Sequence, residues 1–89
     1  MTYEWDRDKA GANVRKHGIF FSDALTVLED DLALTMEDLN ADERRWLTLG
    51  RDHFGRVLVV IYTWRRDEIR IISARKASPD ERRRYGRGE

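Results

Sequence analysis

Residues 57–64 form the longest apolar run in the chain, and this run most constrains the fold. It is rich in β-branched and aromatic residues, which favour a strand, and it is far shorter than the ~18 apolar residues of a membrane span. Apolar side chains occupy successive positions, so they point to both faces of the strand. The run therefore predicts the central strand of a sheet, with helices on one side and a helix or a partner on the other.

Three other segments, at residues 32–35, 46–49 and 69–74, are apolar or alternate with period two, as strands do. The polar segments 52–55 and 65–68 have the length of hairpin connections. The last three strands should therefore form an antiparallel meander.

Before these strands, the pattern changes to that of helices. Residues 3–5 resemble a short edge strand, and a helix follows that Asp6 caps and Gly18 ends. Apolar residues then recur at helical spacing behind Ser22, which predicts a second helix over 22–30 and a helical hairpin.

At the other end of the chain, Ser78, Pro79 and two acidic residues signal the start of a short basic helix over about 79–86. No linker, repeat or low-complexity segment divides the 89 residues. We expect one α+β domain over 1–89, in which an N-terminal strand and a helical hairpin pack on an antiparallel sheet of about four strands.

The net charge of zero hides a polarised charge distribution. Residues 23–43 contain eight acidic and no basic residues, whereas 65–89 contain nine basic and five acidic ones. Clustered positive charge attracts polyanions whatever the net charge of the chain. The basic segment is therefore a candidate surface for nucleic acid, and the acidic segment is a candidate docking surface for a basic partner.

Composition excludes several kinds of chemistry. The chain has no cysteine and two histidines, so we expect no disulfide, no thiolate nucleophile, no metal site and no cofactor. The first residues have neither the basic end nor the apolar stretch of a signal peptide, so we expect a cytoplasmic protein without membrane contact.

Arginines lie near the ends of the predicted strands, at Arg45, Arg65 and Arg75. A guanidinium group holds a phosphate by two parallel hydrogen bonds, and several around one phosphodiester would stabilise its extra-charged transition state. Strict alternation places Arg75 with Ser73 on one face of the last strand, and Arg70 on the other. The alternative is that Arg65, Arg70 and Arg75 pair with Asp67, Glu68 and other acidic residues across the sheet.

Two residues are candidate proton acceptors. His17 lies at the end of the first predicted helix, where it can act as an acid or base or simply pack and interact with the helix C-terminus. Glu43 lies just before two arginines, and it is either a general base or the end of the acidic segment.

Three segments, in this order, resemble the BrnT family of type II toxins: WDRDKAGANVRKHGIFFSDA, DERRWLTLG and GRVLVVIYTWRRDEIRIISARKASPDERRRYG. The stretch RIISARKAS, with ER and a tyrosine after it, is the most specific part. The resemblance covers nearly the whole chain. It implies a RelE-like fold and a metal-independent ribonuclease that inhibits translation.

The resemblance also implies the partners. These are an RNA substrate and a BrnA-like antitoxin with a ribbon-helix-helix DNA-binding part, expected to form a heterotetramer with the toxin. This complex would repress its own operon and would touch operator DNA only through the antitoxin.

Carried over position by position, the family motifs implicate catalytic and RNA-binding residues. In ribonucleases of this kind the 2′-hydroxyl attacks the adjacent phosphate, so no protein nucleophile is needed. We expect Arg65 and Arg75 to hold the scissile phosphate and His17 or Glu43 to take the proton. The expected contacts to the RNA backbone are Lys16, Arg45, Arg70 and Lys76.

Two other functions fit the same residues. One is a non-catalytic RNA-binding or ribosome-binding module that uses the basic face. The other is a co-repressor partner that dimerises a DNA-binding antitoxin.

Overall fold

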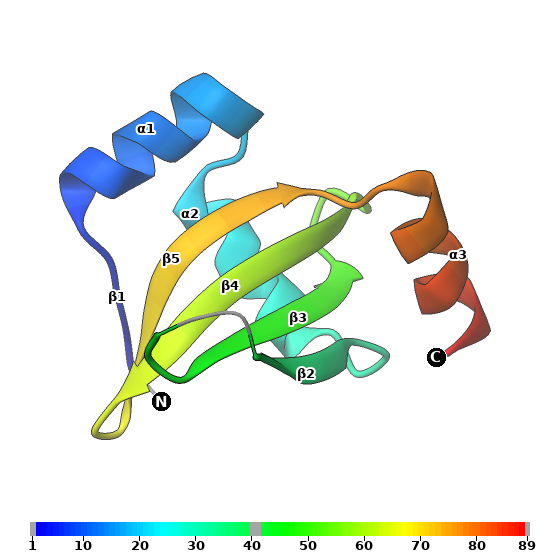
Figure 1. The fold of residues 1–89 in the computed structure, drawn as a ribbon. Helices are drawn as coiled ribbons and strands as arrows, with labels where there is room; N and C mark the ends of the chain where they lie inside the picture. Colours follow the sequence, from blue (N-terminus) through cyan, green and yellow to red (C-terminus); the bar gives the residue numbers. More distant parts are fainter. Residues whose placement is uncertain (1, 40–41, 89) are drawn as a thin grey trace.

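The computed structural model describes residues 2–39 and 42–88 and shows an α+β fold (Figure 1). The elements are β1 (Thr2–Glu4), α1 (Arg7–His17), α2 (Phe21–Ala24), the 3-10 helix η1 (Leu25–Glu29), β2 (Leu34–Asp38), β3 (Arg45–Arg51), β4 (Val57–Arg65), β5 (Glu68–Lys76) and α3 (Pro79–Arg87). None of the helices in the described part has the length and apolar character that spanning a membrane requires.

The five strands form one sheet in the order β1-β5-β4-β3-β2. β3, β4 and β5 pair antiparallel, which confirms the predicted meander and the central place of β4. β1 pairs with β5 in parallel, so the predicted edge strand adds a fifth strand to the sheet.

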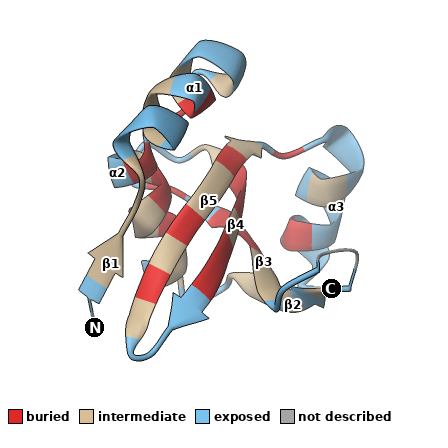
Figure 2. Ribbon diagram, turned by 60° about the vertical axis from the view of Figure 1, so that its left-hand side comes forward, coloured by how far each residue is buried: buried red, intermediate tan, exposed pale blue. Residues whose placement is uncertain are grey.

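Both faces of β4 are covered, as its apolar run requires. On one face Leu58 and Val60 pack against Phe21 and its neighbours from α2 and η1. On the other face Val59 packs with Tyr85 of α3. Figure 2 shows the buried residues along β4 and β5, with α1 and α2 together on one side and α3 apart from them.

The first helix is confirmed at both ends. The Asp6 carboxylate accepts a hydrogen bond from the backbone N of Lys9 at 3.0 Å, and Gly18 ends the helix with a φ of 71°. The second helix differs from the prediction: it begins at Phe21, Ser22 does not cap it, and after Ala24 it tightens to a 3-10 helix. Burial of Phe21, rather than a capping side chain, fixes where this helix starts.

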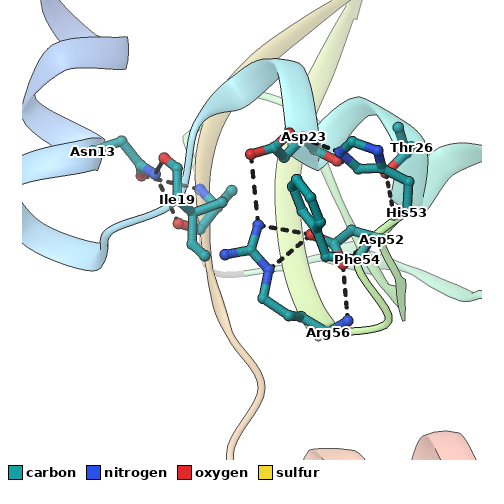
Figure 3. Close-up of polar contacts among 9 residues, drawn as sticks. Asn13, Ile19, Asp23, Thr26, Asp52, His53, Phe54 and Arg56 are labelled. Carbon is teal, nitrogen blue, oxygen red and sulfur yellow. Dashed lines mark hydrogen bonds and ion pairs between the residues drawn. The ribbon is translucent and has the colours of Figure 1, made fainter.

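Asn13 of α1 binds the backbone of β5 beyond the end of β1. Its side-chain amide donates to the carbonyl oxygens of Ile19 (2.9 Å) and Ala74 (2.8 Å) and accepts from the N of Ala74 (3.1 Å). Figure 3 shows the short contacts of Asn13 beside Ile19. One buried side chain thus satisfies the two backbone groups of Ala74 that β1 is too short to pair, and also the carbonyl of Ile19 between α1 and α2.

A β-bulge in β5 overturns the strict alternation expected for that strand. Ile61 pairs with Ser73, but the next residue, Tyr62, pairs with Ile71, so Ile72 is an extra residue. A single extra residue reverses which face the following side chains point to. Arg70 therefore shares a face with Ser73 and Arg75, where strict alternation separated them.

Candidate functional site

We call the surface of the sheet opposite α1 and α2 the open face. Strand register places there Arg45, Leu47, Ile61, Thr63, Arg65, Arg70, Ser73 and Arg75. α3 covers the end near Leu49 and Val59. The uncovered part has an apolar row, Leu47 and Ile61, that leads to the hydroxyl of Ser73, with arginines on both sides.

Arg75 is the most firmly held cation on this face. Its Nη1 and Nη2 donate to the two carboxylate oxygens of Glu81 at 2.7 and 2.9 Å. Glu81 is itself fixed, because it accepts from the N of Ser78 at 2.8 Å in the capping box that starts α3. The arginine is therefore oriented by a carboxylate whose own position is set by a helix start.

The contacts of Arg75 leave part of its guanidinium available. Glu81 takes one hydrogen from each terminal nitrogen, and the carbonyl of Lys76 takes another from Nη1 at 3.3 Å. Among the described residues no other acceptor contacts Arg75, so Nε–H and the second Nη2–H remain. These two N–H groups point in parallel, so together they can donate to two oxygens of one phosphate. We call this pair of donors the free fork of Arg75.

The ion pair lowers the pKa of Glu81 from its ordinary 4.5 to about 2, mainly through the hydrogen bond from Arg75. Because the carboxyl pKa is lower in the folded protein than in the unfolded chain, the ion pair stabilises the fold above pH 4.5. This stabilisation is lost as the pH falls from 4.5 towards 2. Because the Arg75 side chain is 40% exposed, we expect the loss to be only about 1–2 kcal/mol.

Chemical denaturation between pH 2 and 6 measures this contribution. Glu81→Gln keeps the cap acceptor but should show a smaller loss of unfolding free energy on acidification than the wild type. Asp31→Asn, at an exposed position, should keep the full loss. Parallel curves for wild type and Glu81→Gln would contradict the assignment.

Two further arginines of the open face are also paired with acids. Arg70 donates to Glu4 of β1 at 3.1 Å, and the Nε of Arg45 lies 3.6 Å from Glu43. The alternative that arginines pair with acidic residues therefore holds for Arg70 and Arg75, although their partners are Glu4 and Glu81 rather than Asp67 or Glu68. Glu43 and Arg45 meet at the start of β3, two strands away from β5.

His17 and Lys16 belong to α1, and so lie on the side of β5 opposite the open face. Together with Lys9 of α1 and Ser73 of β5, they line a shallow pocket with a volume of about 220 Å³. His17 is also among the basic residues in the last turn of α1, where cations interact favourably with the helix dipole. Ser73 lies on the open face and in this pocket, and so brings His17 near the strand that carries Arg75.

The structure does not bring Arg65 and Lys76 to Arg75. Arg65 pairs in register with Glu68 and Arg75 with Val59, so the two arginines are six β4 positions, roughly 20 Å, apart. Lys76 pairs in register with Leu58, whose side chain packs under α2 and η1, so it points away from the open face. The strand register therefore does not support the expectation that Arg65 and Arg75 bind the same phosphate.

A separate polar network fixes the β3–β4 turn to α2 (Figure 3). The Nε2 of His53 lies 2.8 Å from Asp23, and Arg56 bridges the fully buried Asp52 side chain, at 2.7 Å, and Asp23, at 3.6 Å. Burial alone would raise the pKa of Asp52, but hydrogen bonds from Arg56 and the turn backbone lower it. This cluster holds the fold together at the end of the molecule opposite the β4–β5 hairpin.

Part of the acidic segment also serves the fold. Asp30 accepts from the hydroxyl of Tyr85 at 2.6 Å and from the backbone N of Arg51 at 2.8 Å. Burial opposes ionisation, yet these hydrogen bonds lower the pKa of Asp30. The carboxylate therefore ties α3 to the sheet and is not a free docking group.

The sequence analysis did not predict a role for two residues near these groups, Lys9 and Glu81. Lys9 was missed because helical spacing alone does not say which face of α1 meets β5. Glu81 carried a signal, since Ser78 and Glu81 have the capping-box spacing, but nothing local indicates that its carboxylate reaches Arg75.

An α+β protein that holds a forked arginine on an open sheet face has a group suited to binding a phosphate ester. The sequence profile of the family described as ribonuclease toxin BrnT of type II toxin–antitoxin systems matches residues 5–81. The chain therefore belongs to the BrnT family of ribonuclease toxins.

A solved relative agrees with this assignment. The crystal structure of the ribonuclease toxin BrnT from Brucella abortus is 27% identical in sequence, with a TM-score of 0.68, over 88% of this chain and 99% of that chain. No curated protein matches the sequence.

Proposed function

We propose that this toxin cleaves RNA on the open face without a metal ion, by attack of the 2′-hydroxyl on the adjacent phosphate. The single observation that carries the proposal is Arg75, which Glu81 orients while one fork of its guanidinium stays available. A fixed cation at the scissile phosphate stabilises the extra charge of the transition state without reorganising during the reaction. Arg75 is thus the proposed catalytic phosphate-binding residue, and Glu81 its positioning residue.

The proton of the 2′-hydroxyl requires a base, and position favours His17 over Glu43. His17 shares a pocket with Ser73, which lies on the same strand and face as Arg75. Glu43 lies beside Arg45 on β3, across the apolar row. In this arrangement Lys16, Arg45 and Arg70 contact the RNA backbone beside the reacting phosphate. Arg65 would contact a more distant phosphate, and Lys76 has the weakest support.

The cellular role follows from the family. We propose that RNA cleavage in the cytoplasm inhibits translation, and that a BrnA-like antitoxin neutralises the toxin. The two would form a heterotetramer that represses its own operon through the DNA-binding part of the antitoxin. The class of the protein, a type II toxin, supports a protein antitoxin.

The products of cleavage test the mechanism. Incubating the purified chain with RNA should yield fragments with cyclic phosphate and 5′-hydroxyl ends, and the same fragments should form in excess EDTA. The described residues contain no group of three or more His, Asp and Glu side chains placed to hold a metal ion. Loss of cleavage in EDTA that returns with added magnesium would overturn the metal-free mechanism.

The alternative functions predict other results. An RNA-binding module would bind RNA and leave it intact. A co-repressor would bind the antitoxin but neither bind nor cleave RNA at physiological salt.

A further inference from the structure

The pocket between α1 and the edge of β5 has features that the cleavage step does not use. Two lysines seven residues apart on α1, Lys9 and Lys16, line this pocket, and Ser73 of β5 lines it as well. Residues seven apart lie on one side of an α-helix, two turns from each other. The pocket is therefore a short basic groove that runs along α1.

The groove differs from the open face in whether its cations are paired with carboxylates. On the open face Arg45, Arg70 and Arg75 each have a glutamate partner. Within residues 2–39 and 42–88, neither Lys9 nor Lys16 takes part in a salt bridge, although the backbone hydrogen bond of Lys9 and, to a smaller extent, its charge lower the pKa of Asp6. A cation without a carboxylate on it gains most from a phosphate, because no ion pair has to be broken.

The groove is rigid at its base. Asn13, between the two lysines on α1, is hydrogen bonded to the N and O of Ala74, next to Ser73. These bonds fix the distance between helix and strand before any ligand arrives. A preformed site loses less conformational freedom on binding than a mobile one.

The groove also adjoins the proposed reaction site. Ser73 and Arg75 are two residues apart on one face of β5, about 7 Å along the strand. A phosphate at Ser73 and another at Arg75 would thus be neighbours on one RNA strand. The groove then lies where the strand leaves or enters the open face.

We propose that the groove between α1 and β5 is a phosphate subsite, in which Lys9, Lys16 and Ser73 bind the phosphodiester next to the scissile one. The inference rests on the proposed function, because it takes RNA as the ligand and Arg75 as the residue at the reacting phosphate. It adds Lys9 and Ser73 to the RNA-contacting residues, and it assigns Lys16 to one particular phosphate.

Salt dependence of binding is the direct test. The probe is a short single-stranded RNA with 2′-O-methyl groups throughout, which lacks the nucleophile and stays intact. Each lost phosphate contact should reduce the slope of log affinity against log salt concentration by about 0.7. We expect this reduction, with a several-fold weaker affinity at moderate salt, for Lys9→Ala and for Lys16→Ala.

Arg15→Ala is the matched control, because Arg15 is exposed on the same helix, carries the same charge and does not line the groove. It should bind the RNA with the wild-type slope. Equal slopes for Lys9→Ala, Arg15→Ala and wild type would overturn the subsite.

A second measurement identifies the phosphate. Replacing one phosphate at a time by an uncharged methylphosphonate should reveal a single position at which Lys9→Ala causes no further loss of affinity, since the contact is already absent. Losses that add at every position would overturn the assignment. Because both measurements use uncleavable RNA, they stand even if the wild-type protein fails to cleave RNA, and that failure would count against the proposed function alone.

Discussion

Replacing Arg75 by alanine should lower the rate of RNA cleavage by about 100-fold or more, the cost usually seen when a preorganised transition-state donor is removed. The free fork of its guanidinium is the feature of the open face best placed for a phosphate, and among the contacts of residues 2–39 and 42–88 no other arginine of that face is held by two hydrogen bonds to one carboxylate. Arg75→Lys should recover little, because an ammonium group cannot contact Glu81 and a phosphate with parallel pairs of donors.

Rates of cleavage of a labelled RNA, measured at saturating substrate, check this expectation. Arg7→Ala is a suitable control, because it removes the same side chain from an exposed position in the first turn of α1. Cleavage by Arg75→Ala at the wild-type rate would remove Arg75 from the mechanism. Equal loss in Arg7→Ala would show that general charge, rather than this arginine, governs the rate.

Replacing Asn13 by alanine should have the largest effect on stability. The substitution leaves three backbone groups without their partner: the N and O of Ala74 and the O of Ile19. Each buried polar group left unpaired costs roughly 1–3 kcal/mol, so we expect a loss of about 3–5 kcal/mol. For a domain of this size that lowers the Tm by about 12 °C or more.

Thermal and urea unfolding measure the loss, with Ser22→Ala as the reference. Ser22 is exposed and makes no cap to α2, so its replacement should change the unfolding free energy by less than about 0.5 kcal/mol. An Asn13→Ala protein as stable as Ser22→Ala would mean that water or a shifted backbone replaces the amide.

The sequence predicted the elements whose signals are local. The apolar run of β4 needed cover on both faces, and Asp6 and Ser78 marked two helix starts by their side chains. Local patterns gave wrong predictions where contacts between distant parts of the chain determine the structure. Burial of Phe21 set the start of α2, and the bulge at Ile72 reversed the alternation of β5, which no local pattern indicated.

The site shows the same division. Residue type and family motif led us to propose Arg75 and His17 as site residues, because phosphate chemistry and proton transfer need those side chains. The role of Glu81 was not predictable, since it depends on where α3 folds back relative to β5. The separation of Arg65 from Arg75 also depends on register, which only pairing across the sheet determines.

The contact between Glu81 and Arg75 has a thermodynamic consequence for α3. Glu81 holds the guanidinium only while the first turn of α3 is formed, because its carboxylate is also the reciprocal half of the capping box. Helix formation and arginine orientation are thus linked equilibria, and each must favour the other by the same factor. A molecule that unwinds the start of α3 would therefore release Arg75 without touching the open face, and an anion bound on Arg75 would be sensed as slower amide exchange in that turn.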